Sequence, residues 1–463
     1  MIKKIKVLQY ILLYFTLNGC VSDKMSDTTY FGGKIVNPKS NKVILYTMEK
    51  VVDTFFLNSK NKFIGKIENA NEGLYYFSHG DENQYVYIEP NDSIMLRLNT
   101  WDFDESLVFV GKGADRNNIL IDCFLENEND NKLFYDFNKL GHVDFKNKVD
   151  SLLSLKMITF SDYVNHHPNE TNNYRKILNI ALTFPIYARL ERYPYIHAKI
   201  SKKDSFPKLE TNFYSYRKEI NINSDSLMYY APYSRYVRNN LYNETYALGH
   251  PPTKREFTSQ FTIDLLKTID RKIVTERTKN AILRQTIISH FYNKSSCNIN
   301  KDAFDTFLEL STNQKDKELI LKLLLDTKSV SLNKRLPNFQ LTNYTNSNRN
   351  ISDVIKNKNT FLLFWSPEYV SEDYIASRIN YLSDKYQNIQ FIEIKMDGNF
   401  SQRIRKIDIK NQYYLKDDSK AHEFLTSKMP RSILVNQHGK VVNAYAAISS
   451  TNLNSYLTEL NQN

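Results

Sequence analysis

Short runs that alternate apolar and polar residues fill the segment from residue 30 to residue 112. A period of two places every second side chain on the same face of a strand. Strand runs at roughly ten-residue spacing, separated by turn residues, are typical of a sandwich or barrel. The segment therefore predicts an antiparallel β-sandwich-like domain, with strands at 33–36, 42–46, 53–57, 62–67, 74–77, 85–88, 93–98 and 107–110.

The apolar period changes to that of helices between residues 113 and 330, which predicts an α-helical middle domain. Tyrosines are dense near its centre: Tyr229, Tyr230, Tyr233, Tyr236, Tyr242 and Tyr246. At helical spacing we interpret these rings as core, and the alternative is a Tyr/Phe-lined ligand pocket. The amphipathic windows lie at 117–128, 143–165, 172–192, 207–220, 258–292 and 301–326.

The stretch 360–373 combines a strand, a turn and a helix start. Its apolar run ends at Trp365, breaks at Ser366-Pro367, and gives way to a helical pattern near Ser371. Together with the later strand patterns, this predicts that residues 331–463 form an α/β domain with a mixed sheet and helices on both faces.

Several pieces of this C-terminal segment resemble the TlpA/redoxin-type thioredoxin-like family. They are the entry 336–341, the strand 361–365, the strand 389–394 and the proline strand 429–435. In that family a Cys-x-x-Cys pair follows the first central strand, where a helix N-terminus lowers the pKa of the first thiol. The two corresponding positions here are Tyr369 and Glu372, and neither can form a mixed disulfide.

The resemblance also implies a groove between the proline loop and the cysteine-free turn. Its candidate binding residues are Trp365, Glu368, Met429 and Pro430, with a cis bond expected between the last two. Ser366 and Ser371 are poor substitutes for thiols, so no catalytic residue is assigned.

The first 27 residues have features of a targeting signal. A basic start and an apolar stretch at 7–17 have the length and flanks of a signal peptide, here 1–19. Leu17-Asn18-Gly19-Cys20 resembles the lipobox of bacterial lipoproteins, although Asn18 departs from the usual choice. The resemblance implies lipid attachment at Cys20 by acyl chains such as palmitate, followed by a tether at 20–29. An uncleaved N-terminal anchor is the alternative.

The β-rich segment also resembles an N-terminal domain of unknown function found ahead of thioredoxin-like modules in Bacteroidetes lipoproteins. The resemblance lies in the order of Asp53-Thr54, Asn61-Lys62-Phe63, Pro90-Asn91-Asp92-Ser93 and Gly111-Lys112-Gly113. It implies the following order: a signal peptide (1–19), a tether (20–29), a β-rich domain (30–112), an α-helical domain (113–330) and a thioredoxin-like domain (331–463).

The remaining candidate groups are sparse. Cys123 and Cys297 are interpreted as buried small side chains, with a disulfide between them as the alternative. We expect His79 to be an exposed loop residue, and His166-His167 lacks spaced ligand partners, so no metal or cofactor is expected. The formal charge of +11 comes without a long basic run, which argues against nucleic-acid binding.

The leading hypothesis is a lipid-anchored protein of the cell envelope, on the periplasmic face or the outer-membrane surface. Its redox-inactive thioredoxin-like domain would bind protein or peptide partners, or act as a scaffold. The alternative is an envelope thiol-disulfide oxidoreductase that works with a partner's cysteines. Ligand capture by the aromatic helical middle is a third hypothesis.

Overall fold

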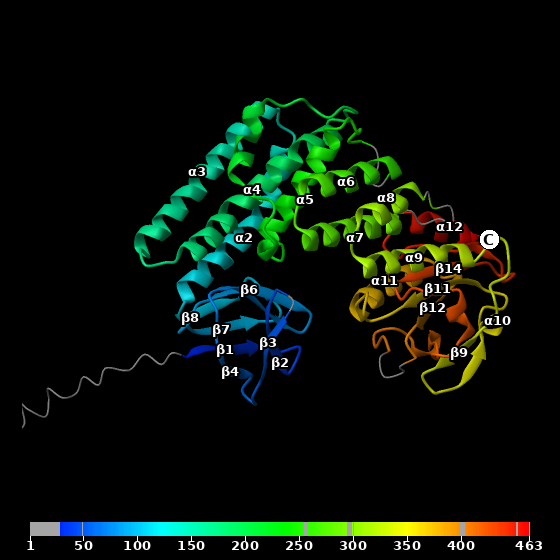
Figure 1. The fold of residues 1–463 in the computed structure, drawn as a ribbon. Helices are drawn as coiled ribbons and strands as arrows, with labels where there is room; N and C mark the ends of the chain where they lie inside the picture. Colours follow the sequence, from blue (N-terminus) through cyan, green and yellow to red (C-terminus); the bar gives the residue numbers. More distant parts are fainter. Residues whose placement is uncertain are drawn as a thin grey trace, which may run out of the picture. The chain divides into compact units, whose positions relative to one another are not determined.

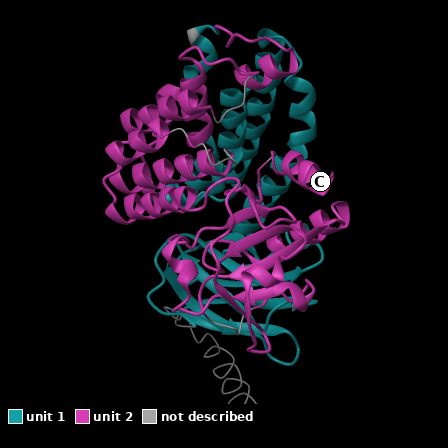
Figure 2. Cartoon of the chain, turned by 90° about the vertical axis from the view of Figure 1, so that its right-hand side faces the viewer, with its two compact units in different colours: residues 1–193, 209–215, 226–236 teal, residues 194–208, 216–225, 237–463 magenta. Residues whose placement is uncertain are grey.

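The chain forms two compact units (Figure 2). The first comprises Met1–Tyr193, Leu209–Ser215 and Ser226–Tyr236, and the second comprises Pro194–Lys208, Tyr216–Asp225 and Val237–Asn463. The helical segment expected as one middle domain is thus divided between them. The computed structural model describes residues 28–48, 50–253, 258–293, 299, 301–398, 403–450 and 452–462.

Eight strands open the first unit, and each overlaps one of the runs expected from the sequence (Figure 1). They form two four-stranded sheets, of order β4-β1-β7-β8 and β3-β2-β5-β6. β1 is antiparallel to β4 but parallel to β7, so the sandwich is not purely antiparallel as expected. The alternation of a run shows its buried face but not the direction of its partner. The strands are β1 (Thr29–Val36), β2 (Lys42–Thr47), β3 (Lys50–Phe56), β4 (Lys62–Ile67), β5 (Gly73–His79), β6 (Glu82–Ile88), β7 (Ser93–Asn99) and β8 (Val108–Lys112).

The sandwich is filled by phenylalanines. The rings of Phe55, Phe63 and Phe77 lie 5.8, 5.6 and 5.8 Å from the ring of Phe31. All four are buried. Tilted and edge contacts at such distances stabilise a core beyond the burial of area alone.

His79 is buried at the end of β5, so the expectation of an exposed loop residue is wrong. Its ring is 1% exposed. Nε2 lies 3.0 Å from the backbone nitrogen of Lys39, which donates to it, and Nδ1 lies 3.0 Å from the carbonyl oxygen of Lys42. These contacts describe a neutral imidazole that closes the β1–β2 turn, and burial lowers its pKa.

Four long helices and two short 3₁₀ segments follow. Tyr233 and Tyr236 of α5 are buried, with their rings 5.8 and 5.4 Å from the ring of Phe184 on α4. These tyrosines are therefore core, as expected. The elements are α2 (Ala114–Phe137), α3 (His142–His166), α4 (Asn172–Ile200), η1 (Thr211–Glu219), η2 (Asp225–Leu227) and α5 (Ala231–Tyr246).

The second unit contains the C-terminal ends of α4, η1 and α5 and continues with α6 (Ser259–Lys272), α7 (Glu276–Asn293), α8 (Asp302–Leu310) and α9 (Gln314–Ser329). The amphipathic window at 258–292 is thus two helices, α6 and α7, and the window at 301–326 is α8 and α9. Asn280 of α7 fixes the α8–α9 turn, because its Oδ1 accepts from the Ser311 hydroxyl (2.8 Å) and the Thr312 amide (3.0 Å). No helix in the described part of the chain is both long enough and apolar enough to cross a membrane.

The C-terminal domain contains a seven-stranded sheet of order β10-β9-β13-β12-β11-β14-β15. Within it, β11 is parallel to β12 and antiparallel to β14, which gives the mixed sheet expected from the sequence. The elements are β9 (Gln340–Asn343), β10 (Asn348–Asn350), α10 (Ile351–Val354), β11 (Asn359–Trp365), α11 (Glu372–Lys385), β12 (Ile389–Lys395), η3 (Ile409–Asn411), β13 (Gln412–Tyr414), η4 (Lys420–Glu423), β14 (Arg431–Val435), β15 (Val441–Asn443) and α12 (Leu453–Gln462).

Both faces of this sheet are covered, because β11 is buried at every position. Leu362 and Phe364 belong to the core cluster that includes Ile351 of α10. Phe361, Leu363 and Trp365 belong to the other cluster, which contains the buried faces of α11 and α12. Strand alternation therefore decides that Trp365 lies under α11.

Candidate functional site

The candidate site is the corner between β11 and α11. The strand ends at Trp365, and the carbonyl oxygen of Ser366 accepts hydrogen bonds from the amides of Tyr369 (3.1 Å) and Val370 (3.3 Å). α11 then begins after Ser371, whose hydroxyl accepts from the Tyr374 amide at 3.3 Å. A serine at this position caps the first orphan amides of a helix.

The two positions expected to carry thiols lie at this corner. Tyr369 is 39% exposed, and burial and the neighbouring Glu368 raise the pKa of its phenol. Glu372 is the first residue of α11, where its charge suits the helix dipole. Neither side chain can exchange a disulfide.

Cys123 is the one cysteine within the described ranges, and it belongs to the first unit. It is free and buried, as the interpretation of a small buried side chain predicts. Burial raises the pKa of its thiol to about 12, so the reactive thiolate is scarce near neutral pH. Cys20 and Cys297 lie outside the described residues.

Three of the four groove candidates are interior. Trp365 and Met429 are 1% and 3% exposed, and Pro430 is also buried. Glu368 alone offers its side chain to solvent, 3.9 Å from Lys428. No peptide bond of the described residues is cis, so the expected cis bond before Pro430 is trans. Trans is the intrinsic preference of an X–Pro bond.

The proline loop is contacted by other parts of the second unit. The hydroxyl of Tyr445 lies 3.4 Å from the carbonyl oxygen of Pro430, and its ring packs edge-on against Phe291 of α7 at 4.3 Å. Asp326 of α9 accepts hydrogen bonds from the backbone amide of Thr426 (2.6 Å) and from that of Ser427 (3.1 Å). α7 and α9 thus hold the loop from within the same unit.

Two buried carboxyl groups of the second unit escaped the sequence reasoning. Burial raises the pKa of Asp326, an effect opposed by Arg431 and by the hydrogen bonds from Thr426 and Ser427. Burial also raises the pKa of Glu393, on β12, to about 8. The sequence could have indicated Glu393, since it occupies the same face of the strand as the buried Ile389 and Phe391.

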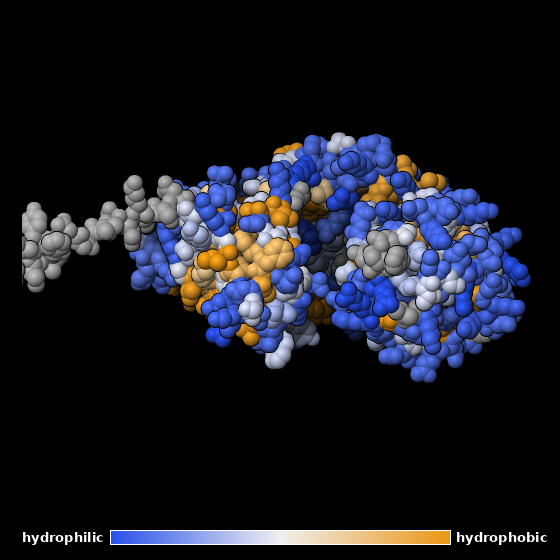
Figure 3. Space-filling model, turned by 90° about the horizontal axis from the view of Figure 1, so that it is seen from below, coloured by the Kyte–Doolittle hydropathy of each residue, from blue (hydrophilic) through white to orange (hydrophobic). Residues whose placement is uncertain are grey.

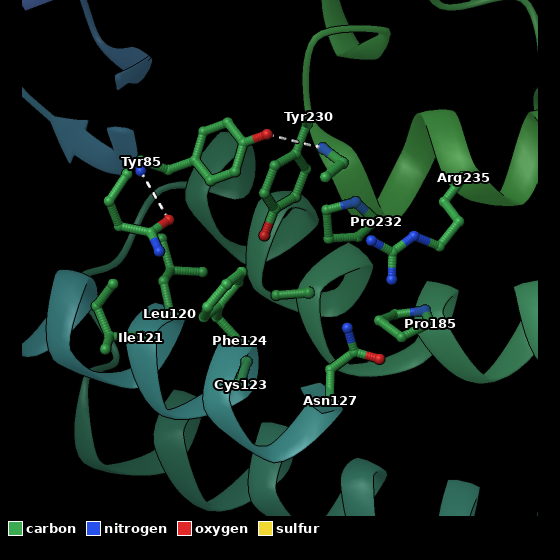
Figure 4. Close-up of a pocket in the computed structure, with 13 residues that line it drawn as sticks. Tyr85, Leu120, Ile121, Cys123, Phe124, Asn127, Pro185, Tyr230, Pro232 and Arg235 are labelled. Atoms are coloured by element: carbon green, nitrogen blue, oxygen red, sulfur yellow. Dashed lines mark hydrogen bonds between the residues drawn. The ribbon is translucent and has the colours of Figure 1, made fainter. Parts of the chain in front are cut away.

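A separate cavity lies within the first unit, between β6, α2, α4 and the start of α5 (Figure 4). Its volume is about 50 Å³, and its walls are largely apolar. Arg235 and the carboxamide of Asn127 lie together on one side, and Tyr85 and Tyr230 cover another. The Tyr85 hydroxyl donates to the Tyr229 carbonyl at 3.0 Å, which ties β6 to this cover.

The third hypothesis expects a pocket lined by Tyr and Phe, and this cavity has three such side chains, Tyr85, Phe124 and Tyr230. Its volume, however, is far below the roughly 300–1,000 Å³ of pockets that bind small molecules. Metal chemistry has no such support, since no three His, Cys, Asp or Glu residues of the described chain gather as ligands. His167 instead lies 3.4 Å from Asp115.

No protein-family model matches the chain, and no curated relative matches it. Part of the chain is similar to solved structures. One is a thiol-disulfide oxidoreductase from Bacteroides fragilis (19% identity, TM-score 0.23, 27% of this chain and 99% of that one). Others are a thiol:disulfide interchange protein from Bacteroides sp. (18%, 0.23, 29% and 92%) and a thiol peroxidase from Chromobacterium violaceum (14%, 0.24, 28% and 86%).

These similarities are too low in identity and TM-score to support a function. The C-terminal domain is thioredoxin-like on its own evidence, namely the mixed strand order and the strand–turn–helix corner. The chemistry of the corner is then set by its residues, which include no thiol.

Proposed function

We propose that the protein is a lipid-anchored protein of the cell envelope whose thioredoxin-like domain binds a protein or peptide partner without exchanging disulfides. The observation that carries this proposal is the corner itself. The resemblance assigns the family's thiol positions to Tyr369 and Glu372, and here these residues lie at a turn that leads into a helix capped by Ser371. A capped helix start without a nucleophile retains the shape of the site and lacks its reaction.

The anchor follows from the lipobox-like stretch that ends at Cys20. Each buried methylene of an acyl chain contributes about 0.8 kcal/mol, so more than one chain holds a folded body firmly to a membrane. The tether at 20–29 is short, which keeps the β-rich part close to the lipid.

The outer surface of α11 is the binding face that the geometry favours. Tyr374 and Tyr381 are 43% and 53% exposed and lie seven residues apart, on one side of the helix. Tyr369 precedes them at the corner. Exposed tyrosines are enriched in protein interfaces, because each supplies a large, rigid contact area. The proline loop offers less, since Tyr445 and α9 already occupy its inner side.

The alternative function is thiol-disulfide exchange that uses this chain's remaining cysteines or those of a partner. The discriminating experiment measures insulin disulfide reduction by the purified full-length protein in detergent, with dithiothreitol as the electron source. We expect the rate to equal that of the protein-free control. The variants Cys123→Ser and Cys297→Ser should match the parent protein.

A rate well above the control that disappears in either cysteine variant would establish the alternative. A thioredoxin sample of known activity serves as the positive control. A rate above the control that persists in both variants would point to a contaminating reductase.

A further inference from the structure

The outer face of the β4-β1-β7-β8 sheet carries an unexplained surface. Across the four strands the pairing places Ile64 opposite Gly32, Gly32 opposite Met95, and Met95 opposite Val110. The neighbouring position on each strand points into the sandwich core, so these four share the outer side. Ile64 and Val110 are 66% and 59% exposed.

Basic residues border this apolar row on both sides. Lys62, Lys34 and Arg97 form one adjoining row, and Lys66 and Lys112 lie in the other. All five are exposed. No Asp or Glu occupies an outer position of these four strands. Lys66 pairs with Glu68, just beyond the end of β4, at 3.1 Å.

The row of Lys62, Lys34 and Arg97 has an electrostatic cost in the folded protein. Like charges directly opposite each other on neighbouring strands destabilise a sheet. An anionic surface laid against the row would remove this repulsion. The apolar row beside it would be buried by the same contact. The Met95 side chain packs over Gly32 in this row, since a Cβ on Gly32 would meet the Met95 sulfur at 2.9 Å.

The position of β1 in the chain identifies the occupant. β1 runs through the middle of this face and begins at Thr29, nine positions after Cys20. A fully extended chain spans at most about 3.6 Å per residue, so the start of β1 lies within about 32 Å of an acylated Cys20. This step rests on the lipid anchor of the proposed function.

We propose that the outer face of the β4-β1-β7-β8 sheet rests on an anionic phospholipid surface. Lysine and arginine beside apolar side chains are the combination that binds at the interface of such a membrane. Figure 3 shows hydrophobic side chains gathered beside hydrophilic ones on the β-rich part, at the left. A second copy of this chain fits less well, because a two-fold contact would set five cations against five.

The test uses the chain from residue 28 onward, which contains every described residue and lacks Cys20. Its co-sedimentation is measured with vesicles of phosphatidylglycerol mixed with phosphatidylcholine, and with phosphatidylcholine alone. We expect binding to the anionic vesicles that weakens as salt is raised. Lys34→Ala combined with Lys62→Ala should lower the partition coefficient about 25-fold, because each basic residue near an anionic surface contributes a factor of about five.

Ile64→Ser combined with Val110→Ser should also weaken binding, which separates the apolar contribution from the charge. The matched controls are Lys356→Ala with Lys358→Ala, and Val274→Ser, all at exposed positions of the second unit. Thermal unfolding of each variant checks that the fold is retained.

Equal binding to neutral and anionic vesicles, or equal loss in the control variants, would overturn the proposal. Competition by a short DNA duplex as strong as that by anionic vesicles would make the face a general polyanion site and also overturn it. Mass spectrometry of the envelope form, which reads acylation of Cys20, tests the anchor separately. Because the test protein lacks Cys20, vesicle binding tests the sheet face alone, and its outcome does not depend on whether Cys20 is acylated.

Discussion

Glu393 shows how one buried side chain alters the stability of the C-terminal domain. It is 1% exposed on β12, and no hydrogen bond from another described residue reaches either carboxylate oxygen. A carboxylate without partners in a low-dielectric interior is strongly disfavoured, so the group stays protonated to unusually high pH. Burial raises its pKa to about 8.

The sign of the pH dependence follows from this raised pKa. Between about pH 4.5 and pH 8 the unfolded chain has lost this proton while the folded chain retains it. The folded state then binds more protons, so stability falls as pH rises, by about 1.4 kcal/mol per pH unit. We expect Glu393→Gln to remove this slope, leaving the unfolding temperature little changed near pH 4.5 and raised at pH 7.5.

Calorimetry of the full chain at the two pH values makes the measurement. Glu309→Gln, at an exposed position of α8, is the matched control and should shift neither value. An equal effect of Glu393→Gln at both pH values would contradict the raised pKa.

At the scale of elements, α11 begins where the sequence predicts it and presents exposed tyrosines on its outer face. The sequence predicted its start near Ser371, and the structure begins it at Glu372 with Ser371 as the cap. Ile375, Ile379 and Leu382 bury its inner face. Its outer face carries the exposed tyrosines Tyr374 and Tyr381.

The variant Tyr374→Ala with Tyr381→Ala tests this outer face. A photo-crosslinker at residue 378, between the two rings, is used to capture a partner in intact envelopes. We expect one protein adduct that the double variant reduces at least about ten-fold, since interface tyrosines rank among the residues that carry most binding energy. Unfolding of the variant should be unchanged.

The control carries the crosslinker at Tyr135, a 64% exposed tyrosine on α2. An adduct of the same mass from that position, or an adduct unaffected by the double variant, would remove α11 from the proposal.

At the scale of the whole molecule, Arg116 joins the β-rich part of the first unit to its helices. This α2 side chain is 5% exposed and forms ion pairs with Glu89 and with Asp92, the latter at 2.8 Å. The hydroxyl of Tyr174 on α4 donates to the Arg116 carbonyl at 2.8 Å. The boundary expected after residue 112 therefore crosses a shared buried network.

Removal of Arg116 leaves Asp92 buried without its cation. We expect Arg116→Met to destabilise the first unit by about 3–5 kcal/mol, measured by urea denaturation of the full chain. Adding Asp92→Asn should recover part of the loss, because it removes the stranded charge. Lys176→Met, at an exposed position of α4, is the control. A loss as large for Lys176→Met would argue against a specific network.

The local sequence pattern by itself determined most of the secondary structure and the absence of thiols at the corner. The eight strands of the β-rich part, most helical windows and the corner at Trp365–Ser371 follow from periodicity, Pro and Ser, which act over a few residues. The absence of thiols at Tyr369 and Glu372 is likewise a property of the sequence alone.

The tertiary structure decided what depends on distant partners. Burial of His79, the parallel pairing of β1 with β7, and the contacts that Tyr445 and Asp326 make with the proline loop all depend on residues far apart in the chain. The apolar and basic rows of the β4-β1-β7-β8 face appear only when the register aligns four strands. A one-dimensional pattern states which side of a strand is buried, and only packing decides which side chains then meet.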